Sequence, residues 1–477
     1  MTLSRRHLLE TAGIGGVALC LPLWAGRVSA ATGALTPEQF GAKGDGRTND
    51  SAAFAALAAE VNRRGRGEIH LRRAVYIVGR QTQAFRSRAS YAFEPAKIME
   101  FVGLSGPLTI RGNGAVLRCA RGLRYGTFNP MTGAKTVHPM PHTAPGELST
   151  PYRWMILVKD CRGAVDISDL ELDGNIVGQS IGGKWGDTGW QIPAGGIALV
   201  GNRGSERLSR IHSHHHGQDG LYVDGVDSAR SARSLIANVR CEYNGRQGCS
   251  VVGGRGYDFR DCQFNHTGRA NVASAPGAGV DIEAEAGKKV RDISFSNCTF
   301  SNNSGQGMVA DSGDSEGVNF TACTFIGTTN WAIWPNKPRF RFNRCTFVGP
   351  IVQAYGSARP ELACQFYDCT FRDDPALAPG RRVYGGTNTD RPIADLPSQP
   401  NVLFSRCRFE LTHEAVLPWT TQVIYADCFL SQRSKRTSYP RGFYLGRSTL
   451  IGEAGISGSL IKGELMFNGT RMTGRVG

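Results

Sequence analysis

The chain has 477 residues, 40% of them hydrophobic and 20% charged, a composition that excludes a disordered protein and suits either one long repeat domain or several globular ones. Its net charge of +15 favours a polyanionic partner. The sequence has no helix-turn-helix, zinc-finger or RNA-recognition pattern, so we expect no nucleic acid as that partner.

Residues 1–30 have the features of a twin-arginine signal peptide. Ser4-Arg5-Arg6-His7 precedes an apolar stretch from about Ala12 to Ala25, and Val28-Ser29-Ala30 offers a small-residue cleavage site. The apolar stretch is short and glycine-rich, so we expect no stable membrane anchor. Cleavage would remove three arginines and one glutamate and leave a net charge of +13. We therefore expect a periplasmic or extracellular protein.

An N-terminal cap is predicted over about residues 36–80. A short helix would begin at Asp50 or Ser51 and end at Gly65, and a strand would follow from Glu68. Such a helix would cover the first coil of a repeat domain. Its apolar positions recur at helical spacing: Phe54, Leu57, Ala58 and Val61.

A Cys-x-aromatic triplet recurs along the second half of the chain. Its steps are 21, 36, 25, 22, 24, 38 and 21 residues, which indicates a coil of 21–25 residues with two insertions. Three short strands and three turns fill such a step, so the repeat predicts an all-β parallel β-helix, a solenoid that forms a single domain over residues 31–477. The copies are Cys241-Glu-Tyr243, Cys262-Gln-Phe264, Cys298-Thr-Phe300, Cys323-Thr-Phe325, Cys345-Thr-Phe347, Cys369-Thr-Phe371, Cys407-Arg-Phe409 and the degenerate Cys428-Phe429.

Strand periodicity predicts where the repeated side chains point. Alternate residues of a strand share a face, so the cysteine and the aromatic residue of each copy should both point inward, in columns with ~4.8 Å between coils. The mature chain would keep 12 of its 13 cysteines. An even number in an exported protein can mean disulfides, but the column favours small, reduced, buried side chains. By the same alignment, His212 and His214 are expected to face inward.

Three insertions interrupt the repeat and would form surface loops, near residues 121–150, 173–195 and 373–400. The second insertion carries Trp185, Asp187 and Trp190. Aromatic rings stack on sugar faces, so these three residues are candidates for substrate binding. The alternative is that the two tryptophans pack on the surface of the solenoid.

A second repeated strand gives an outer surface. Residues one and three places after its leading glycine face the core, and the residues between and after them face outward. Tyr222 and Asp224 therefore point out in one coil, and Arg246 and Gln247 lie at the start of the next strand. The copies are Gly220-Leu-Tyr-Val223, Gly248-Cys-Ser-Val251, Gly279-Val-Asp-Ile282 and Gly307-Met-Val-Ala310.

Asp281 and Glu283 are the leading candidates for chemistry on this surface. Two carboxylates two residues apart on one strand face suit acid/base work or a hard cation such as Ca²⁺. The alternative is an ordinary solvated face. Together with Arg246, Asp219, Tyr222 and Asp224 they make up the predicted catalytic set.

A run of histidines precedes this surface in the sequence. His215 and His216 lie in the turn before Asp219, so we expect a histidine near the substrate, together with Gln247. Adjacent histidines seldom supply the geometry that a metal needs. We therefore expect no metal at this turn.

Two segments carry a family resemblance. Phe40-Gly-Ala-Lys-Gly-Asp45-Gly-Arg-Thr-Asn-Asp50-Ser-Ala-Ala-Phe54 and the strand from Glu68 to Gly79 resemble the opening of the pectate-lyase and polygalacturonase-like superfamily. The resemblance implies a right-handed β-helix and action on uronate-rich polysaccharides. Polygalacturonase-type hydrolases carry a pair of aspartates one coil after a position that resembles Asp219. This chain has Arg246-Gln247 there, which argues against their arrangement.

These observations lead to one main functional hypothesis and two rivals. The main hypothesis is a lyase that cleaves an acidic, uronate-containing polysaccharide by β-elimination, with no cofactor other than Ca²⁺. Either Ca²⁺ on Asp281 and Glu283 or Arg246 itself would neutralise the sugar carboxylate. The base stays open among Arg246, Tyr222 and a nearby histidine. The rivals are a glycoside hydrolase and a non-catalytic carbohydrate-binding surface protein on the same fold. The polysaccharide, an epimerase reaction in place of cleavage, and the oligomeric state stay open.

Overall fold

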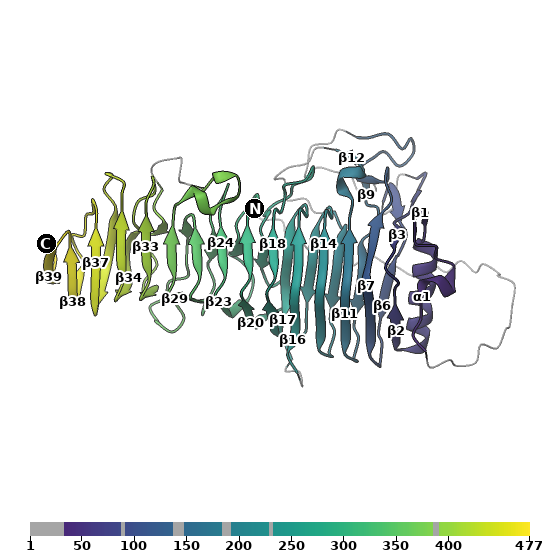
Figure 1. The fold of residues 1–477 in the computed structure, drawn as a ribbon, viewed down its shortest axis with the longest axis horizontal. Coiled ribbons are helices and arrows are strands. Elements are labelled where there is room, and N and C mark those ends of the chain that lie inside the picture. Colours follow the sequence, from purple (N-terminus) through teal and green to yellow (C-terminus); the bar gives the residue numbers. More distant parts are fainter. Residues whose placement is uncertain (1–32, 87–90, 137–146, 184–191, 229–231, 385–390) are drawn as a thin grey trace. The chain divides into compact units, whose positions relative to one another are not determined.

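Three short parallel strands per coil stack on the equivalent strands of the next coil and form three continuous faces, here called faces one, two and three (Figure 1). This coiled unit spans residues 34–477. None of the helices in the part that can be described is long and apolar enough to cross a membrane. The computed structural model describes residues 33–86, 91–136, 147–183, 192–228, 232–384 and 391–477.

The strands fall on the faces as follows. Four strands run through faces one and two: β7 (Leu108–Cys119), β11 (Val165–Asp173), β14 (Glu206–His214) and β16 (Ser234–Glu242). Face one also holds β2 (Gly67–His70), the end of β17 (Gln247–Arg260), β20 (Val290–Ser296), β23 (Ser315–Thr321), β26 (Arg341–Asn343), β29 (Gln365–Tyr367) and β32 (Leu403–Ser405). Face two also holds β3 (Val75–Val78), β18 (Gln263–Asn265), β21 (Thr299–Ser301), β24 (Thr324–Ile326), β27 (Thr346–Val348), β30 (Thr370–Arg372), β33 (Arg408–Leu411), β35 (Phe429–Gln432) and β37 (Arg447–Ile451).

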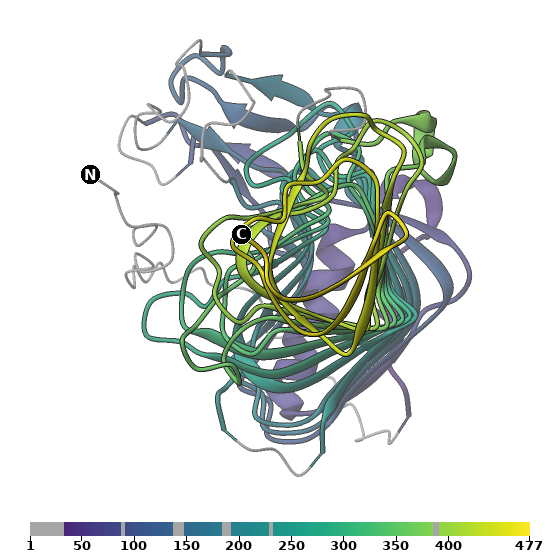
Figure 2. The same ribbon diagram turned by 90° about the vertical axis from the view of Figure 1, so that its left-hand side faces the viewer.

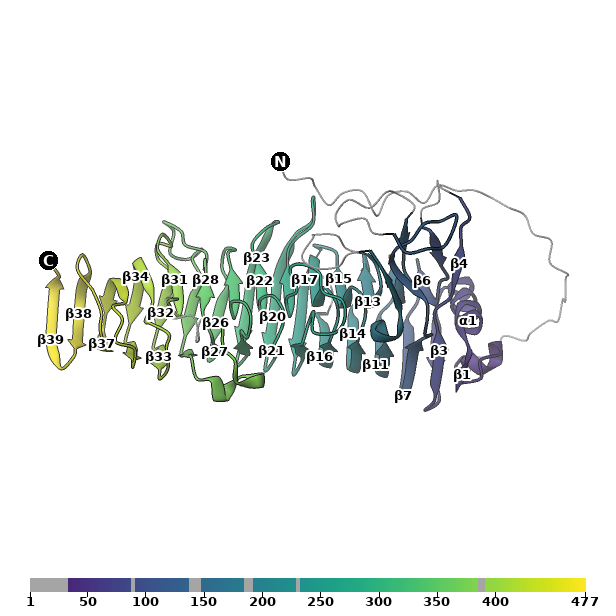
Figure 3. The ribbon, with the colours of Figure 1, turned by 90° about the horizontal axis from the view of Figure 1, so that it is seen from above.

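Face three carries the outer surface predicted above, and several of its strands follow one another along the unit in Figure 3. It holds β6 (Met99–Val102), β10 (Trp154–Lys159), β13 (Gly195–Val200), β15 (Asp219–Asp224), the start of β17, β19 (Val280–Ile282), β22 (Met308–Ala310), β25 (Ile333–Pro335), β28 (Ile351–Val352) and β31 (Ala394–Leu396). Strands β34 (Trp419–Ala426) and β36 (Tyr439–Leu445) run from face three into face one, and β38 (Leu460–Phe467) and β39 (Thr470–Arg475) close the unit as an antiparallel pair.

The predicted N-terminal helix is confirmed as α1 (Ser51–Arg64), at the end of the unit opposite β39 (Figure 1). Its apolar face is buried, and the ring of Phe54 packs edge-on against Tyr76 of the first coil, 5.2 Å between centroids. Asp50 precedes the helix, but its carboxylate accepts hydrogen bonds from the amides of Lys43 and Gly44 instead of capping it. The 3₁₀ helix η1 (Pro37–Phe40) and strand β1 (Asp45–Asn49) precede α1 in the chain.

The described residues of the first two insertions include strands, where surface loops were predicted. They contribute to a separate five-stranded sheet with β4 (Gln81–Gln83), β5 (Phe93–Pro95), β8 (Arg124–Thr127), β9 (Leu148–Ser149) and β12 (Ser180–Gly182). Strand β8 of the first insertion pairs with β12 of the second, so the two insertions are joined by backbone hydrogen bonds. The remaining 3₁₀ helices are η2 (Ile176–Gly178) and, in the third insertion, η3 (Pro375–Leu377) and η4 (Pro379–Arg381).

In the later coils, aromatic columns along faces one and two fill much of the core. Seen end-on, the coils of this unit lie over one another (Figure 2), so equivalent side chains come into contact. Phe300 is fully buried and stacks on Phe264 and Phe325 at centroid distances of 5.5 and 4.7 Å. The inward direction predicted for the aromatic residues is therefore confirmed from Phe264 to Phe409, whereas Phe429 of the degenerate copy faces outward in register with Arg408.

From Cys262 to Cys428, the cysteines of the repeat are also buried in a column. Each thiol lies close to a backbone carbonyl of the preceding coil. The Sγ atom of Cys262 is 3.4 Å from the oxygen of Ile236, and that of Cys298 is 3.7 Å from the oxygen of Phe259. These thiols fill the corner between faces one and two as small apolar groups.

We expect the thiols of Cys262, Cys298, Cys323 and Cys345 to resist alkylation in the folded protein, because all four are buried. All four should react after unfolding without a reductant. Mass spectrometry of the native and unfolded protein measures both states. Failure to react in the unfolded protein until a reductant is added would mean disulfides and would contradict the prediction.

Two details of the repeat were predicted wrongly. Cys241 pairs in register with Phe264 and not with Cys262, and Tyr243 lies in the turn after β16 with a positive φ of 55°. In the coil before, Ser213 is the residue in register with Cys241, so His212 and His214 face outward. The corner has two residues in both coils, 238–239 and 261–262, so Cys241 occupies the position of the aromatic residue and not that of the cysteine.

Candidate functional site

A buried ion pair lies on the outer side of face three, where β15 and β17 begin. The Nε atom of Arg246 donates to Oδ1 of Asp219 at 2.7 Å, and a second guanidinium nitrogen donates to Oδ2. Ser250 Oγ also donates to Asp219 Oδ2, at 2.9 Å. The side chain of Asp219 is 0% exposed and that of Arg246 is 10% exposed. A charged pair this enclosed is unusual on the outside of a solenoid, where charges ordinarily meet water.

The next coil extends this network through Gln247 and Asp281. Ser250 and Asp281 are in register on the outer side of β17 and β19. Gln247 Nε2 donates to Asp281 Oδ2 at 3.0 Å, and its Oε1 accepts the amide of Ala278 at 3.1 Å, so the backbone fixes the glutamine. Burial alone would lower the pKa of Arg246, but the charge and hydrogen bonds of Asp219 and the charge of Asp281 raise it. Arg246 is therefore a permanent cation between two carboxylates.

Tyr222 and Asp224 lie beside this network, on β15. The hydroxyl of Tyr222 donates to Glu285 Oε1 at 3.0 Å, and its ring packs against Trp154 with 5.4 Å between centroids. Lys288 Nζ lies 2.6 Å from Asp224 Oδ2. Burial, followed by the charges of Glu285 and Asp224, raises the pKa of Tyr222 above its usual range. Tyr222 thus keeps its proton at neutral pH.

Asp281 and Glu283 bind different partners. Asp281 bonds Gln247 of the coil before it, whereas Glu283 Oε1 accepts the hydroxyl of Ser312 from the coil after it. Strand β19 ends at Ile282, so the outward alternation ends before Glu283. Among the described residues, the groups of three ligands close enough to hold an ion include neither carboxylate. Calcium binding by this pair stays a prediction.

The five-stranded sheet contacts the backbone just before Asp219 through Tyr125. The hydroxyl of Tyr125, on β8, donates to the backbone oxygens of Gly217 at 2.8 Å and Ile192 at 3.0 Å, just before Asp219. This contact was missed in the sequence because no pattern links residue 125 to residue 217. Trp185, Asp187 and Trp190 lie outside the described residues.

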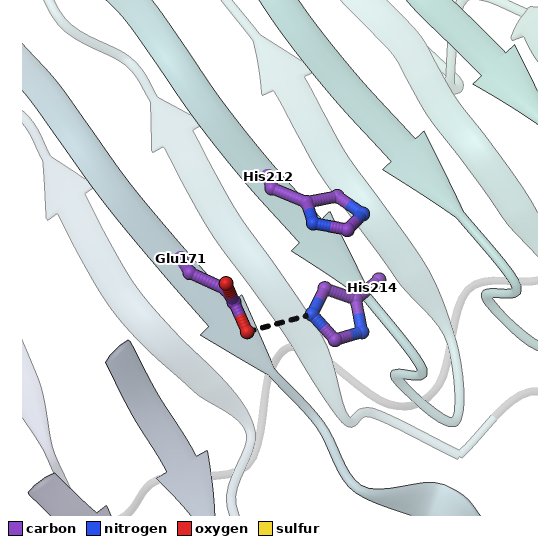
Figure 4. A group of neighbouring side chains, drawn as sticks. All are labelled: Glu171, His212 and His214. Atoms are coloured by element: carbon purple, nitrogen blue, oxygen red, sulfur yellow. Dashed lines mark hydrogen bonds and ion pairs between the residues drawn. The ribbon is translucent and has the colours of Figure 1, made fainter. Parts of the chain in front are cut away.

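The histidines of the turn lie away from the Asp219 network. His215 stacks on Tyr243 at 5.0 Å, and His216 is fully buried and bonds the hydroxyl of Tyr152 through Nδ1 at 2.8 Å. His212 and His214 lie beside them on the outer side of face two, next to Glu171 (Figure 4). Ser250, Glu285 and Lys288 were not among the predicted site residues. Of these, only Ser250 had a signal, its outward position in Gly248-Cys-Ser-Val251.

We expect acid to destabilise the protein through His216. Burial lowers its pKa well below the usual value, because no charge can be hydrated there. Below about pH 6.5 the unfolded chain therefore binds a proton that the folded chain does not, and stability falls by up to about 1.4 kcal/mol per pH unit. Above that pH both states are neutral and the effect vanishes. Urea unfolding of His216→Asn between pH 7 and 5 should show a smaller loss than the original protein, and equal losses in both would contradict this role.

Comparisons with known proteins agree with this fold. A family described as "Right handed beta helix region" matches residues 156–347. No curated protein matches the sequence. The N-terminal fragment of bacteriophage phi29 gene product 12 is similar with a TM-score of 0.50 and 12% identity, over 92% of this chain and 73% of that one.

Two further solved structures are similar to this chain at lower scores. The A-module of mannuronan C-5 epimerase AlgE4 from Azotobacter vinelandii has a TM-score of 0.41 and 15% identity, over 88% of this chain and 96% of its own. The tailspike protein gp49 of Acinetobacter baumannii bacteriophage Fri1, a capsular polysaccharide depolymerase, has 0.43 and 12%, over 90% and 64%. Identities this low describe the fold and not the chemistry. The chain is a right-handed parallel β-helix protein, as the repeat and the resemblance at its N-terminus predicted.

Proposed function

We propose that this protein is an exported polysaccharide lyase that cleaves a uronate-containing chain by β-elimination on the outer side of face three. The observation that carries the proposal is the enclosed network of Asp219, Arg246, Ser250, Gln247 and Asp281. The positive net charge and the resemblance at residues 40–54 support an acidic polysaccharide as substrate. A signal peptide over residues 1–30, with a periplasmic or extracellular destination, is part of the same proposal.

In the proposed β-elimination, Arg246 would neutralise the carboxylate of the uronate. In β-elimination a base removes the proton at C5 of the uronate, a C4–C5 double bond forms, and the C4–O bond breaks. The sugar carboxylate must be neutralised before C5 gives up its proton. Arg246 is held in place by Asp219 and stays charged, so it suits this electrostatic role. Because Arg246 keeps its proton, it is unsuitable as the base.

The remaining proton transfers are assigned by elimination. Tyr222 keeps its proton at neutral pH and therefore suits donation to the leaving oxygen. His216 is enclosed and cannot reach a substrate. A carboxylate of Asp281 or Glu283 is then the proposed base. A Ca²⁺ ion on these two residues is the alternative way to neutralise the uronate, and the separate partners of the two carboxylates favour Arg246.

We expect the Asp281→Asn and Glu283→Gln variants each to lose activity on an acidic polysaccharide. Asp281 is 6% exposed and bonded to Gln247, so a folding measurement must accompany its assay. Unsaturated product is followed by ultraviolet absorbance, with reducing ends measured in parallel. Full activity in both variants would move the site away from face three.

The same assays separate the alternatives. New reducing ends without ultraviolet absorbance would indicate a glycoside hydrolase. Binding without turnover on a panel of acidic and neutral polysaccharides would indicate a carbohydrate-binding protein. We expect activity to survive EDTA. Activity lost to EDTA and restored by Ca²⁺ would assign the neutralising role to the ion instead of Arg246.

A further inference from the structure

A second group of side chains on face two has the composition of a metal site. His214 is the last residue of β14, and its Nδ1 atom lies 2.7 Å from Nδ1 of His215. The same Nδ1 lies 3.9 Å from Oδ1 of Asp173, the last residue of the neighbouring strand β11. One possible ligand atom from each of Asp173, His214 and His215 lies within 4.8 Å of those of the other two residues. From these contacts we propose that Asp173, His214 and His215 bind a divalent transition-metal ion of the zinc type.

The backbone explains how two adjacent histidines converge. His214 points outward from the strand, and His215 follows it with a positive φ of 54°, which turns the second ring beside the first. Stacking on Tyr243 holds the ring of His215, and Arg118 holds Asp173 by donating from Nε to Oδ2 at 2.7 Å. The ligands are therefore oriented before any ion arrives. We expected adjacent histidines to fail as ligands, and this local conformation removes that objection.

Glu171 supports the assignment of the ligand atom. Its Oε1 lies 3.4 Å from Nε2 of His214, as the dashed line in Figure 4 shows. A carboxylate on one ring nitrogen orients a ligating histidine and leaves the other nitrogen for the metal. The two facing Nδ1 atoms share one proton as a hydrogen bond, and an ion binding there would release that proton.

His212 fits less well, although it can be grouped with Glu171 and His214. Its Nε2 bonds Glu242 at 3.1 Å, and its Nδ1 faces the guanidinium of Arg240 at 3.1 Å. A second cation at that position would be repelled. The ion is therefore placed at the Asp173 end of the cluster.

The donor set identifies the kind of ion. Two imidazoles and one carboxylate suit zinc, copper, nickel or iron better than Ca²⁺, which prefers oxygen ligands. Tetrahedral zinc with bonds of 2.0–2.2 Å places its ligand atoms about 3.3 Å apart, between the two distances of 2.7 and 3.9 Å found here. Three protein ligands leave a fourth position for water or an anion. A groove of about 400 Å³ is lined in part by Glu171 and His212, the neighbours of His214.

Calorimetric titration of the chelator-treated full chain with Zn²⁺ tests the site. We expect one ion per chain and a rise in Tm with added Zn²⁺. The His214→Ala/His215→Ala double variant should lose saturable binding, and Glu171→Gln should bind about 10–100-fold more weakly. His70→Ala is the matched control, because His70 also pairs with a glutamate but lies on β2.

Two results would overturn the proposal. One is the absence of saturable Zn²⁺ binding by the original protein. The other is equal binding by the double variant and the original. Asp173→Asn changes one ligand without changing its size, so it decides the matter if the double variant does not fold. Because binding and Tm are read without a polysaccharide, the outcome is independent of the lyase proposal.

Discussion

The Arg246→Met variant is expected to lose about 3–5 kcal/mol of stability together with its activity. Asp219 would remain as a buried carboxylate without its cation, and removal of one partner from a buried pair costs about this much. Denaturant unfolding measures the stability, and the ultraviolet assay measures the elimination. The activity should fall even at temperatures where the variant is fully folded, because the group that neutralises the uronate is gone.

The Arg210→Met variant provides the matched control. Arg210 makes a two-pronged contact with Asp169, but its side chain is 59% exposed, so its loss should change the stability far less than the loss of Arg246. The Asp219→Asn/Arg246→Met double variant removes both charges and should recover part of the lost stability without recovering activity. A single Arg246→Met variant as stable as Arg210→Met would show that the buried pair does not form.

Replacing Phe300 by alanine is expected to destabilise the protein by about 3–5 kcal/mol. Its ring is fully buried between Phe264 and Phe325 and also contacts Phe295 and Phe320 edge-on. The neighbouring coils are held at a fixed spacing by backbone hydrogen bonds, so they cannot collapse into the space left behind. Urea unfolding gives the free energy directly.

Thr299→Ala on the same strand is the control for that experiment. Thr299 faces outward in register with Thr324, so its replacement should change stability by no more than about 1 kcal/mol. Near-normal stability of the Phe300→Ala variant would contradict the assignment of the inner side of β21. A large loss in Thr299→Ala would contradict the assignment of its outer side.

Much of the fold was predictable because a parallel β-helix repeats its local rules. The spacing of Cys262, Cys298 and Cys323 indicates the length of a coil. The alternation of side chains along each strand indicates that Phe300 and Phe325 lie on its buried side. The same alternation predicted an outward Tyr222 and Asp281. These features depend on residues a few positions apart, so they can be predicted from the sequence.

The candidate sites depend on contacts between coils, and only the three-dimensional structure identified these contacts. The bond from Gln247 to Asp281 joins residues 34 positions apart, and that from Tyr125 to Gly217 joins residues 92 apart. Insertions change the number of residues per coil, so sequence distance does not reveal which side chains become neighbours. Asp281 and Glu283 illustrate this, because each bonds a residue from a different coil.

The sequence thus predicted the solenoid, its capping helix and the inward columns from Phe264 to Phe409, since each follows from local spacing and strand alternation. The three-dimensional structure decided the register of Cys241, the outward direction of His212 and His214, and the convergence of His214 and His215 on Asp173. The physical reason is the corner between faces. The residue with a positive φ at this corner directly precedes Cys262 but stands three places before Cys241, so the shared cysteine does not mark the same position in the two coils.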